Sequence, residues 1–539
     1  MTLPIPNQGF LAIMNLSDQS FTSPLVTVTG ISMGDEGKGR VVHEILENEK
    51  KIHNRPAAGV MKVNGGANAG HTAAGLKLNL LPSGVGDPDV KTLLIGSGVV
   101  ADPRKFLWEA RPLEARGIKV LNRLLIDERC QVSDLSHRLL DLAWERYRVN
   151  QLGMESRGST GRGISPAYGD ETGQWQIFYQ AFQESKDLFI ITLKQRVQRA
   201  VDTIRSVCKI KDSEWYEFFD ILTSAENRAN QDSIKEQIFS ETEFDFSRFL
   251  GKEPFTLNLD ALVEVYWRAG QELEPYIGDG RDFLIQSVEE KRLVVAEFGQ
   301  AYWLDKRHGF TPNVTASHTS TAELFHSGGI PIQPVTEVGC CKAYDTKVGT
   351  HHFLTQIDHQ SDPWGKKLAK LEFGTSTGRQ RMVGWFDAVE KGNALRYGGF
   401  NQLVINKLDA LTLDNTVPPE LKICTAYQTE NGELSYKVPR KEKIRQKLTP
   451  LYKILPGWSE DIQKIKSFVN LPQEAQVYIA EMLGSLLDVA YPNGLSDLTN
   501  VPEIRFIGVG PNPGEIIADI PNTRQLLELR KPVELSAVS

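Results

Sequence analysis

Short apolar runs, each ended by glycine or a polar residue, recur along the chain. The first, residues 25–30, leads through a glycine-rich turn into apolar residues at helical spacing between Val41 and Leu46. The other runs are residues 59–64, 92–95, 293–296, 403–405 and 504–507. Their length and β-branched content predict buried strands.

Helical patterns lie between several of these runs. One begins at Asp102-Pro103, where a carboxylate can cap the helix and proline suits the first helical position, and it stops before Gly117. Strands that alternate with helices predict an α/β fold with a central, mostly parallel sheet flanked by helices.

Two segments differ from this alternation. Residues 1–22 carry prolines and small polar residues, and we expect a flexible N-terminal extension. Residues 209–275 mix charged residues with aromatic ones such as Trp215 and Phe218, and we expect a helical insertion on the surface.

Composition narrows the class of protein. The 539 residues have a net charge of −7, are 40% hydrophobic and 24% charged, which favours a soluble globular protein and disfavours a general nucleic-acid binder. No apolar run approaches the roughly 20 residues that span a bilayer. Residues 1–15 make a poor secretory signal, and an odd set of five cysteines without a Cys-x-x-Cys pair favours a reducing, cytoplasmic location.

The loop at residues 30–39 has the layout of a phosphate cradle, because glycines let backbone N–H groups approach phosphate oxygens. It is not a standard P-loop: Ser32 stands where that motif needs glycine, and Gly39 stands where it needs a hydroxyl. Asp35 is a candidate substitute for the missing Mg²⁺ ligand. The alternative is a tight turn with a solvated lysine.

Three further loops are rich in glycine and polar residues. Residues 64–72 surround His71 with glycine and asparagine, residues 158–168 contain Arg162 among hydroxyl residues, and residues 372–387 place two arginines after Thr-Ser-Thr. Hydroxyls and guanidinium groups suit phosphate or carboxylate ligands. Each loop alone is also compatible with an ordinary turn, and Arg162 alone with a surface residue.

Asn406-Lys-Leu-Asp409 follows a predicted strand. GTP-binding proteins use this kind of tetrapeptide to bind guanine, whose N1–H and 2-amino group donate to the carboxylate. Chance matches to so short a motif are common.

Taken in order, these motifs resemble the adenylosuccinate synthetase family. The similarity rests on residues 34–39, 68–72, 80–84, 161–168, 298–300, 308–309, 314–315, 375–381, 384–387, 407–409 and 455–458, and it extends over about residues 25–515. Many weak motifs in the family's order are far more specific than any one of them.

The resemblance implies a P-loop-like GTP-binding fold with insertions, in which residues 23–539 form the catalytic domain. It also implies a GTP-dependent ligase that forms adenylosuccinate from IMP and L-aspartate through 6-phosphoryl-IMP, with Mg²⁺ as cofactor, in a homodimer. The partners expected are IMP, L-aspartate and GTP, with no nucleic acid and no membrane.

The resemblance also assigns residues. The implied catalytic residues are Asp35, Lys38 and His71, and the implied Mg²⁺ ligands are Asp35 and the Gly70 carbonyl. IMP and aspartate would contact Asn68, Thr160, Gln300, Thr315, Thr375, Ser376, Thr377, Arg379 and Arg381. GTP would contact Gly34, Glu36, Gly37, Lys38, Gly39, Arg381, Lys407, Leu408, Asp409, Gly508 and Gly510.

The chain also departs from the family pattern. Gln174 stands where members carry an arginine that crosses the dimer interface to the neighbour's IMP phosphate, and Gln380 replaces a usual proline. A glutamine brings no charge, at a cost of about 1–3 kcal/mol per lost charged contact. Two alternatives therefore stay open: the same chemistry on another 6-oxopurine nucleotide, or a non-catalytic GTP-binding paralogue.

Overall fold

A computed structural model describes residues 20–347, 352–373, 380–496, 498 and 500–530. Its centre is a ten-stranded sheet. In spatial order the strands are β21 (Ile516–Ile517), β20 (Glu503–Gly508), β16 (Gln402–Asn406), β11 (Thr336–Lys342), β1 (Leu25–Gly30), β10 (Val294–Ala301), β2 (Gly59–Lys62), β5 (Thr92–Ile95), β7 (Leu124–Asp127) and β9 (Ile277–Gly278). The short edge pair β20–β21 is antiparallel, and the other neighbours are parallel.

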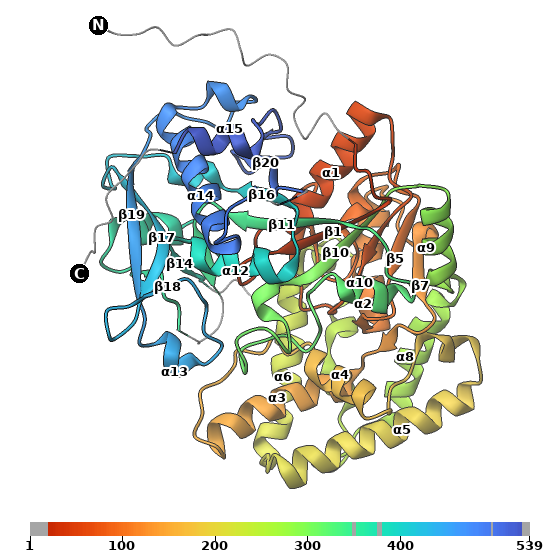
Figure 1. Ribbon diagram of the computed structural model, residues 1–539. Helices are drawn as coiled ribbons and strands as arrows, with labels where there is room; N and C mark the ends of the chain where they lie inside the picture. Colours follow the sequence, from red (N-terminus) through yellow and green to blue (C-terminus); the bar gives the residue numbers. More distant parts are fainter. Residues whose placement is uncertain (1–19, 348–351, 374–379, 497, 499, 531–539) are drawn as a thin grey trace, which may run out of the picture.

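Helices flank this sheet, as Figure 1 shows, and the predicted α/β class is confirmed. They are α1 (Lys38–His53), α2 (Pro103–Ala115), α3 (Leu135–Asn150), α4 (Ile164–Thr172), α5 (Lys186–Asp202), α6 (Asp212–Ala229), α7 (Gln231–Lys235), α8 (Leu259–Leu273), α9 (Gly280–Glu289), α10 (Ala322–Gly328), α11 (Pro363–Ala369), α12 (Ala388–Gly398), α13 (Glu442–Arg445), α14 (Gln473–Ala490) and α15 (Thr523–Glu528). None of those helices has the length and apolar character needed to cross a membrane.

Smaller sheets complete the architecture. One contains β15 (Phe386–Asp387), β17 (Glu420–Gln428), β18 (Leu434–Ser435) and β19 (Thr449–Pro456). Another contains β12 (Asp345–Lys347), β13 (Gln356–Ile357) and β14 (Met382–Gly384). Two pairs remain, β3 (His71–Ala73) with β4 (Leu76–Leu78), and β6 (Val100–Ala101) with β8 (Gln131–Val132).

The predicted strand–loop–helix unit is present as β1 and α1. Val41, Val42, Ile45 and Leu46 are buried in the main hydrophobic core together with Val26 of β1. Each such side chain contributes roughly 1.5–3 kcal/mol when it leaves water, so this packing fixes where α1 begins above the sheet. The predicted helix at Asp102 is also confirmed, and the Asp102 carboxylate caps it by accepting from Arg104 N at 3.0 Å.

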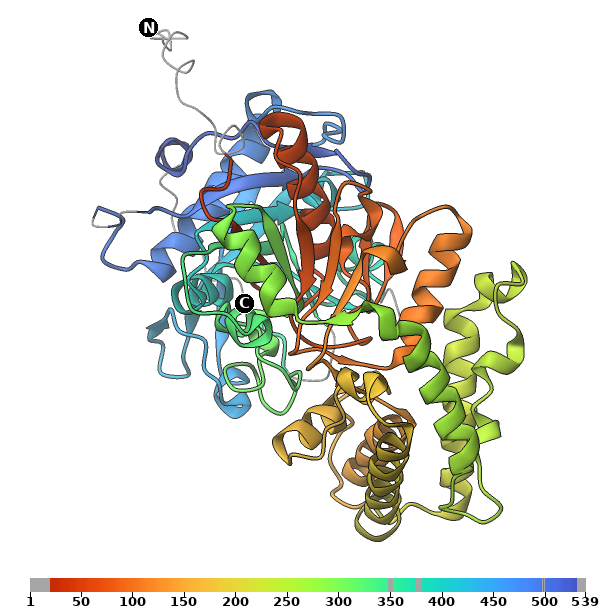
Figure 2. The same ribbon diagram turned by 90° about the vertical axis from the view of Figure 1, so that its right-hand side faces the viewer.

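The 209–275 segment contains α6, α7 and α8, and together with α3, α4 and α5 it extends beyond one end of the sheet (Figure 2). Most of its aromatic residues are buried, although Tyr216 is 39% exposed. Trp215, Phe218 and Tyr266 are buried and belong to the same hydrophobic core as α1 and β1. The segment is therefore continuous with the body of the protein.

Candidate functional site

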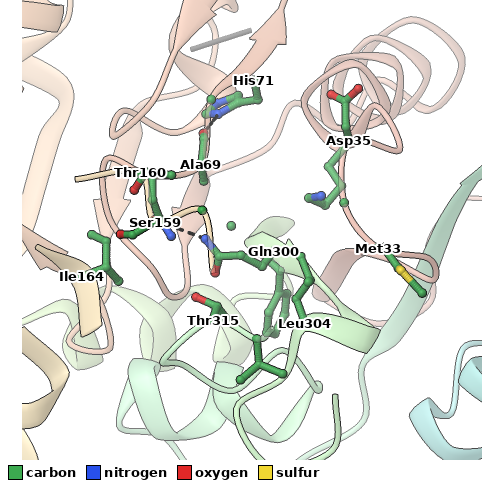
Figure 3. A pocket seen from close by; sticks show the side chains of 18 of the residues that line it. Met33, Asp35, Ala69, His71, Ser159, Thr160, Ile164, Gln300, Leu304 and Thr315 are labelled. Atoms are coloured by element: carbon green, nitrogen blue, oxygen red, sulfur yellow. Dashed lines mark hydrogen bonds between the residues drawn. The ribbon is translucent and has the colours of Figure 1, made fainter. Parts of the chain in front are cut away.

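A cavity of about 350 Å³ opens at the carboxyl ends of the central strands. Loops after β1, β2 and β10 line it, together with the segment between α3 and α4. Ligands of open α/β sheets usually bind at this edge. In Figure 3, Ser159, Thr160 and Ile164 lie on the side of the pocket opposite Asp35.

The loop after β1 folds around one acidic side chain. Glu36 is buried; its Oε1 accepts from Gly34 N at 2.6 Å and its Oε2 lies 3.1 Å from Lys38 Nζ. Burial alone would lower the pKa of Lys38, but the Glu36 carboxylate raises it above the ordinary value, so the ammonium stays charged. Gly37 caps α1 at φ 83°, in the region that favours glycine.

Asp35 extends from this loop into the cavity. Lys342 Nζ lies 3.2 Å from Asp35 Oδ2, and Arg381 Nη1 contacts the same oxygen. Lys342 ends β11, and Arg381 directly precedes β14. Segments far apart in the sequence thus fix the direction of this one carboxylate.

Glu372 forms ion pairs with the same two cations, Lys342 and Arg381. Its Oε2 is 3.0 Å from Lys342 Nζ and 3.2 Å from Arg381 Nη1, while Oε1 lies 2.6 Å from Lys407 Nζ. Burial alone would raise the pKa of Glu372, but the neighbouring lysines lower it to about 2. One buried carboxylate therefore orients both cations that contact Asp35.

His71 faces the cavity in a defined orientation. Its Nδ1 lies 2.9 Å from the Ala69 carbonyl, which can only accept, so Nδ1 carries a proton. Its Nε2 is buried, has no hydrogen-bond partner among the described residues, and lies 3.7 Å from Glu297 Oε1. Burial alone would raise the pKa of Glu297, but the neighbouring His71 and Lys62 lower it, so a carboxylate faces this nitrogen.

Amide and hydroxyl groups occupy the other side. Gln300 Nε2 donates to Asn68 Oδ1 at 3.3 Å, and Asn68 Oδ1 also accepts from Gly66 N at 3.1 Å. Thr315 N donates to Leu304 O at 2.8 Å, which holds the Thr315 hydroxyl at the pocket (Figure 3). Uncharged groups of this kind suit a base or a sugar.

The Asn406–Asp409 motif packs against the loop at residues 30–39, the predicted phosphate cradle. Asn406 Nδ2 donates to Glu36 O at 2.7 Å. Asp409 Oδ1 is buried and has no hydrogen-bond partner within the described part of the chain, and burial raises the pKa of Asp409. A buried acceptor of this kind is suited to a ligand that brings N–H groups.

Helix α1 also holds the loop after β20. Arg40 Nη2 donates to Glu515 O at 2.8 Å, and Arg40 Nη1 contacts Gly510 O. One turn further along, Glu44 Oε1 accepts from Gly514 N at 2.8 Å. The loop after β20, which contains the predicted GTP contact Gly510, is thereby attached to the helix that begins after the loop at residues 30–39.

The structure brings most of the predicted residues together. The cavity is lined by Gly34, Asp35, Gly37, Lys38, Gly39, Asn68, Gly70, His71, Thr160, Gln300, Thr315 and Arg381. Outside its lining lie Glu36, Lys407, Leu408, Asp409, Gly508 and Gly510. Thr375, Ser376, Thr377 and Arg379 lie outside the described residues. Gln380 ties the adjoining end of that segment, since its Nε2 donates to Ala369 O and Glu372 O, both at 2.7 Å.

Two features were not expected. Lys342 and Glu372 are absent from the residues predicted for the site, although a lysine at the end of a buried strand is a signal that could have indicated Lys342. Arg162, which suggested a phosphate contact or a surface residue, is instead paired with Glu226 of α6.

A family profile and curated relatives indicate the same protein family, and a solved structure of that family has a similar fold. The family profile described as adenylosuccinate synthetase matches residues 27–512. The adenylosuccinate synthetase of Geobacter sp. (strain M21) is 32% identical over 500 residues, covering 91% of this chain and 97% of that protein. That of Parafrankia sp. (strain EAN1pec) is 32% identical over 501 residues, covering 92% and 98%. The structure of fully ligated adenylosuccinate synthetase from Plasmodium falciparum resembles this fold with a TM-score of 0.72 at 24% identity, covering 92% and 100% of the two chains.

Proposed function

The chain belongs to the adenylosuccinate synthetase family, and from this premise we propose roles for the residues of its pocket. The enzyme is a GTP-dependent ligase that joins L-aspartate to IMP in purine biosynthesis. The observation that carries the residue roles is that Asp35, His71 and Arg381, from three distant segments, line one cavity.

The chemical difficulty lies at the purine 6-oxygen, which is a poor leaving group. Removal of the N1 proton makes that oxygen nucleophilic, and it then attacks the γ-phosphorus of GTP and releases GDP. The aspartate amine attacks C6 of the resulting 6-phosphoryl-IMP, and phosphate leaves. Asp35 is the proposed base, because Lys342 and Arg381 direct its carboxylate into the cavity.

The other two catalytic assignments concern the phosphoryl group. His71 donates from Nε2 towards the leaving oxygen of GTP, and its proton on Nδ1 and the nearby Glu297 suit that role. Lys38, kept charged by Glu36, balances the negative charge of the phosphates.

Mg²⁺ fits the donors present. The Asp35 carboxylate and the Gly70 carbonyl line the same cavity, and hard oxygen ligands supplemented by substrate phosphates are what this ion prefers. When bound, Mg²⁺ supplies positive charge to the phosphoryl group. The protein groups that would hold it are Asp35 and the Gly70 carbonyl.

We assign the remaining ligands by position. IMP contacts the amide and hydroxyl side at Asn68, Gln300 and Thr315, and guanine contacts Lys407 and Asp409. The aspartate substrate binds near Arg381. Five buried free cysteines agree with the predicted cytoplasmic location.

We further propose a homodimer. Gln174 is exposed on the turn after α4, and Trp175 beside it is 57% exposed. Leu188 and Ile191, one helical turn apart on α5, are 54% and 53% exposed. We propose that these exposed apolar side chains contribute to the dimer contact. Light scattering should give a dimer, and L188E/I191E should give a monomer.

The deciding experiment offers purified enzyme GTP, Mg²⁺, L-aspartate and a panel of purine monophosphates. We expect a succinylated product from IMP. Product from a guanine or other 6-oxopurine nucleotide alone would refute IMP as the substrate and favour the alternative raised by Gln174. GTP binding without any product would refute catalysis.

A further inference from the structure

The pocket wall that carries Ser159 and Thr160 is a loop, residues 156–163, without helix or strand. Its position therefore depends on side-chain contacts. One face of α3 supplies them through Arg138, Asp141 and Glu145, at positions i, i+3 and i+7.

These contacts run along the loop in order. Glu145 Oε2 accepts from Gly158 N at 3.1 Å. Asp141 accepts from Ser159 Oγ at 2.7 Å and from Gly163 N at 3.1 Å. Arg138 Nε donates to Gly161 O at 3.0 Å. Each contact places a backbone group or a pocket-lining residue.

The last contact depends on a residue from the 209–275 segment. Glu226 of α6 is fully buried, and its Oε1 lies 2.8 Å from Arg138 Nη1. Arg162 Nη1, from the loop itself, contacts the same oxygen. Burial raises the pKa of Glu226, but the Arg162 and Arg138 guanidinium groups together lower it well below its usual range. One carboxylate thus joins α3 to the loop.

The Glu226 carboxylate balances the positive charge of two neighbouring guanidinium groups. Arg138 is buried and Arg162 retains only 11% of its side-chain exposure, so the two cations lie close together away from bulk water. Burial lowers the pKa of Arg138, and the Arg162 charge lowers it further. Without an anion between them they would repel each other, and Arg162 belongs to the loop, which has no helix or strand to hold it in place.

We propose that Glu226 is a positioning residue for the nucleotide monophosphate, acting through Arg162 and Arg138 on the loop that presents Ser159 and Thr160. Glu226 itself does not line the pocket. The proposal rests on the proposed function, because it takes the occupant of this side to be IMP. It gives the 209–275 segment a task in substrate binding.

The test is E226Q, which keeps the shape and removes the charge. We expect the KM for IMP to rise about tenfold or more, since loss of one hydrogen bond to a charged group changes a binding constant by about tenfold to 100-fold. The KM for GTP and kcat should stay within about threefold of wild type. Amides 158–163 should exchange hydrogen faster in the unliganded variant.

The matched control is E217Q. Glu217 also lies on α6 and pairs with Arg146 of α3 at 2.6 Å, but both side chains are exposed. An exposed pair contributes little, so this variant should match wild type in KM and exchange. R162Q and E226Q/R162Q complete a double-mutant cycle, and the double variant should be no worse for IMP than R162Q alone.

Three results would overturn the proposal. They are an unchanged IMP KM and unchanged exchange in E226Q, an equal loss for IMP, GTP and kcat with a lowered Tm, or full additivity in the cycle. If wild-type enzyme fails to use IMP, the proposed function fails, while faster exchange confined to residues 158–163 still supports the positioning role of Glu226.

Discussion

Replacement of Asp409 by asparagine should weaken GTP binding without lowering the thermal stability of the protein. Asp409 would accept hydrogen bonds from guanine N1–H and from the 2-amino group. Each bond to a charged group contributes about 1.5–3 kcal/mol, so their loss amounts to about 3–6 kcal/mol. At about 1.4 kcal/mol per factor of ten, the KM for GTP should rise by about 10² to 10⁴.

The same substitution should leave the thermal stability of the protein unchanged or raise it. Asp409 Oδ1 is buried without a hydrogen-bond partner in the described residues, and burial raises its folded pKa. A raised carboxyl pKa means that the folded state favours the protonated form, so stability falls as pH rises through that pKa. D409N removes this penalty, and its Tm at pH 7 should equal or exceed that of wild type.

The assay measures initial rates with GTP and with XTP at saturating IMP and L-aspartate, together with thermal unfolding. XTP carries an oxygen where GTP has the 2-amino group, and the asparagine amide can donate to it, so D409N should use XTP better than wild type does. D414N is the control, because Asp414 is exposed and pairs with Lys367 at 3.1 Å. A GTP KM within about threefold of wild type in D409N would refute guanine recognition by this residue.

Three further substitutions test the pocket. E372Q should lower the free energy of unfolding by about 3 kcal/mol at pH 7, because the pKa of the Glu372 carboxyl falls from 4.5 to about 2 on folding. In urea denaturation, the difference in stability between wild type and E372Q should shrink as the pH falls from 4.5 towards 2. A difference that stays constant with pH would contradict the charge argument. D35N should abolish product formation while calorimetry still detects GTP binding, and full turnover would refute Asp35 as the base. G39A should reduce kcat by about tenfold or more, because its Cβ would lie 2.9 Å from Thr72 O and 3.0 Å from His71 Cδ2; an unchanged kcat would show that the loop adapts.

The sequence was sufficient for elements whose signal is local. The runs at residues 92–95 and 504–507 are strands because β-branched and apolar side chains suit a sheet covered on both faces. β11 was not among the predicted strands, since Gly339, Cys340 and Cys341 interrupt its β-branched residues. The glycine-rich loops at residues 30–39, 64–72 and 158–168 likewise contribute residues to the lining of the cavity.

Pairings between distant residues could not be predicted in the same way. Lys342 and Asp35 are separated by 307 positions, and Arg162 and Glu226 by 64. Nothing local distinguishes Glu226 from the exposed Glu217 on the same helix. Only the fold decides which carboxylate is buried against two arginines, because that choice depends on how α3 and α6 pack.

Helix α1 has a mechanical consequence for the nucleotide. The loop before its first turn is proposed to bind the phosphates, and Arg40 and Glu44, in its first two turns, hold the loop after β20 that is proposed to contact GTP. An α-helix is stiff, so the first two turns of α1, which begins at Lys38, set the distance between these two loops. Residues in either loop can then be exchanged in evolution without altering that distance, whereas loss of both Arg40 and Glu44 would remove these contacts between α1 and the loop after β20.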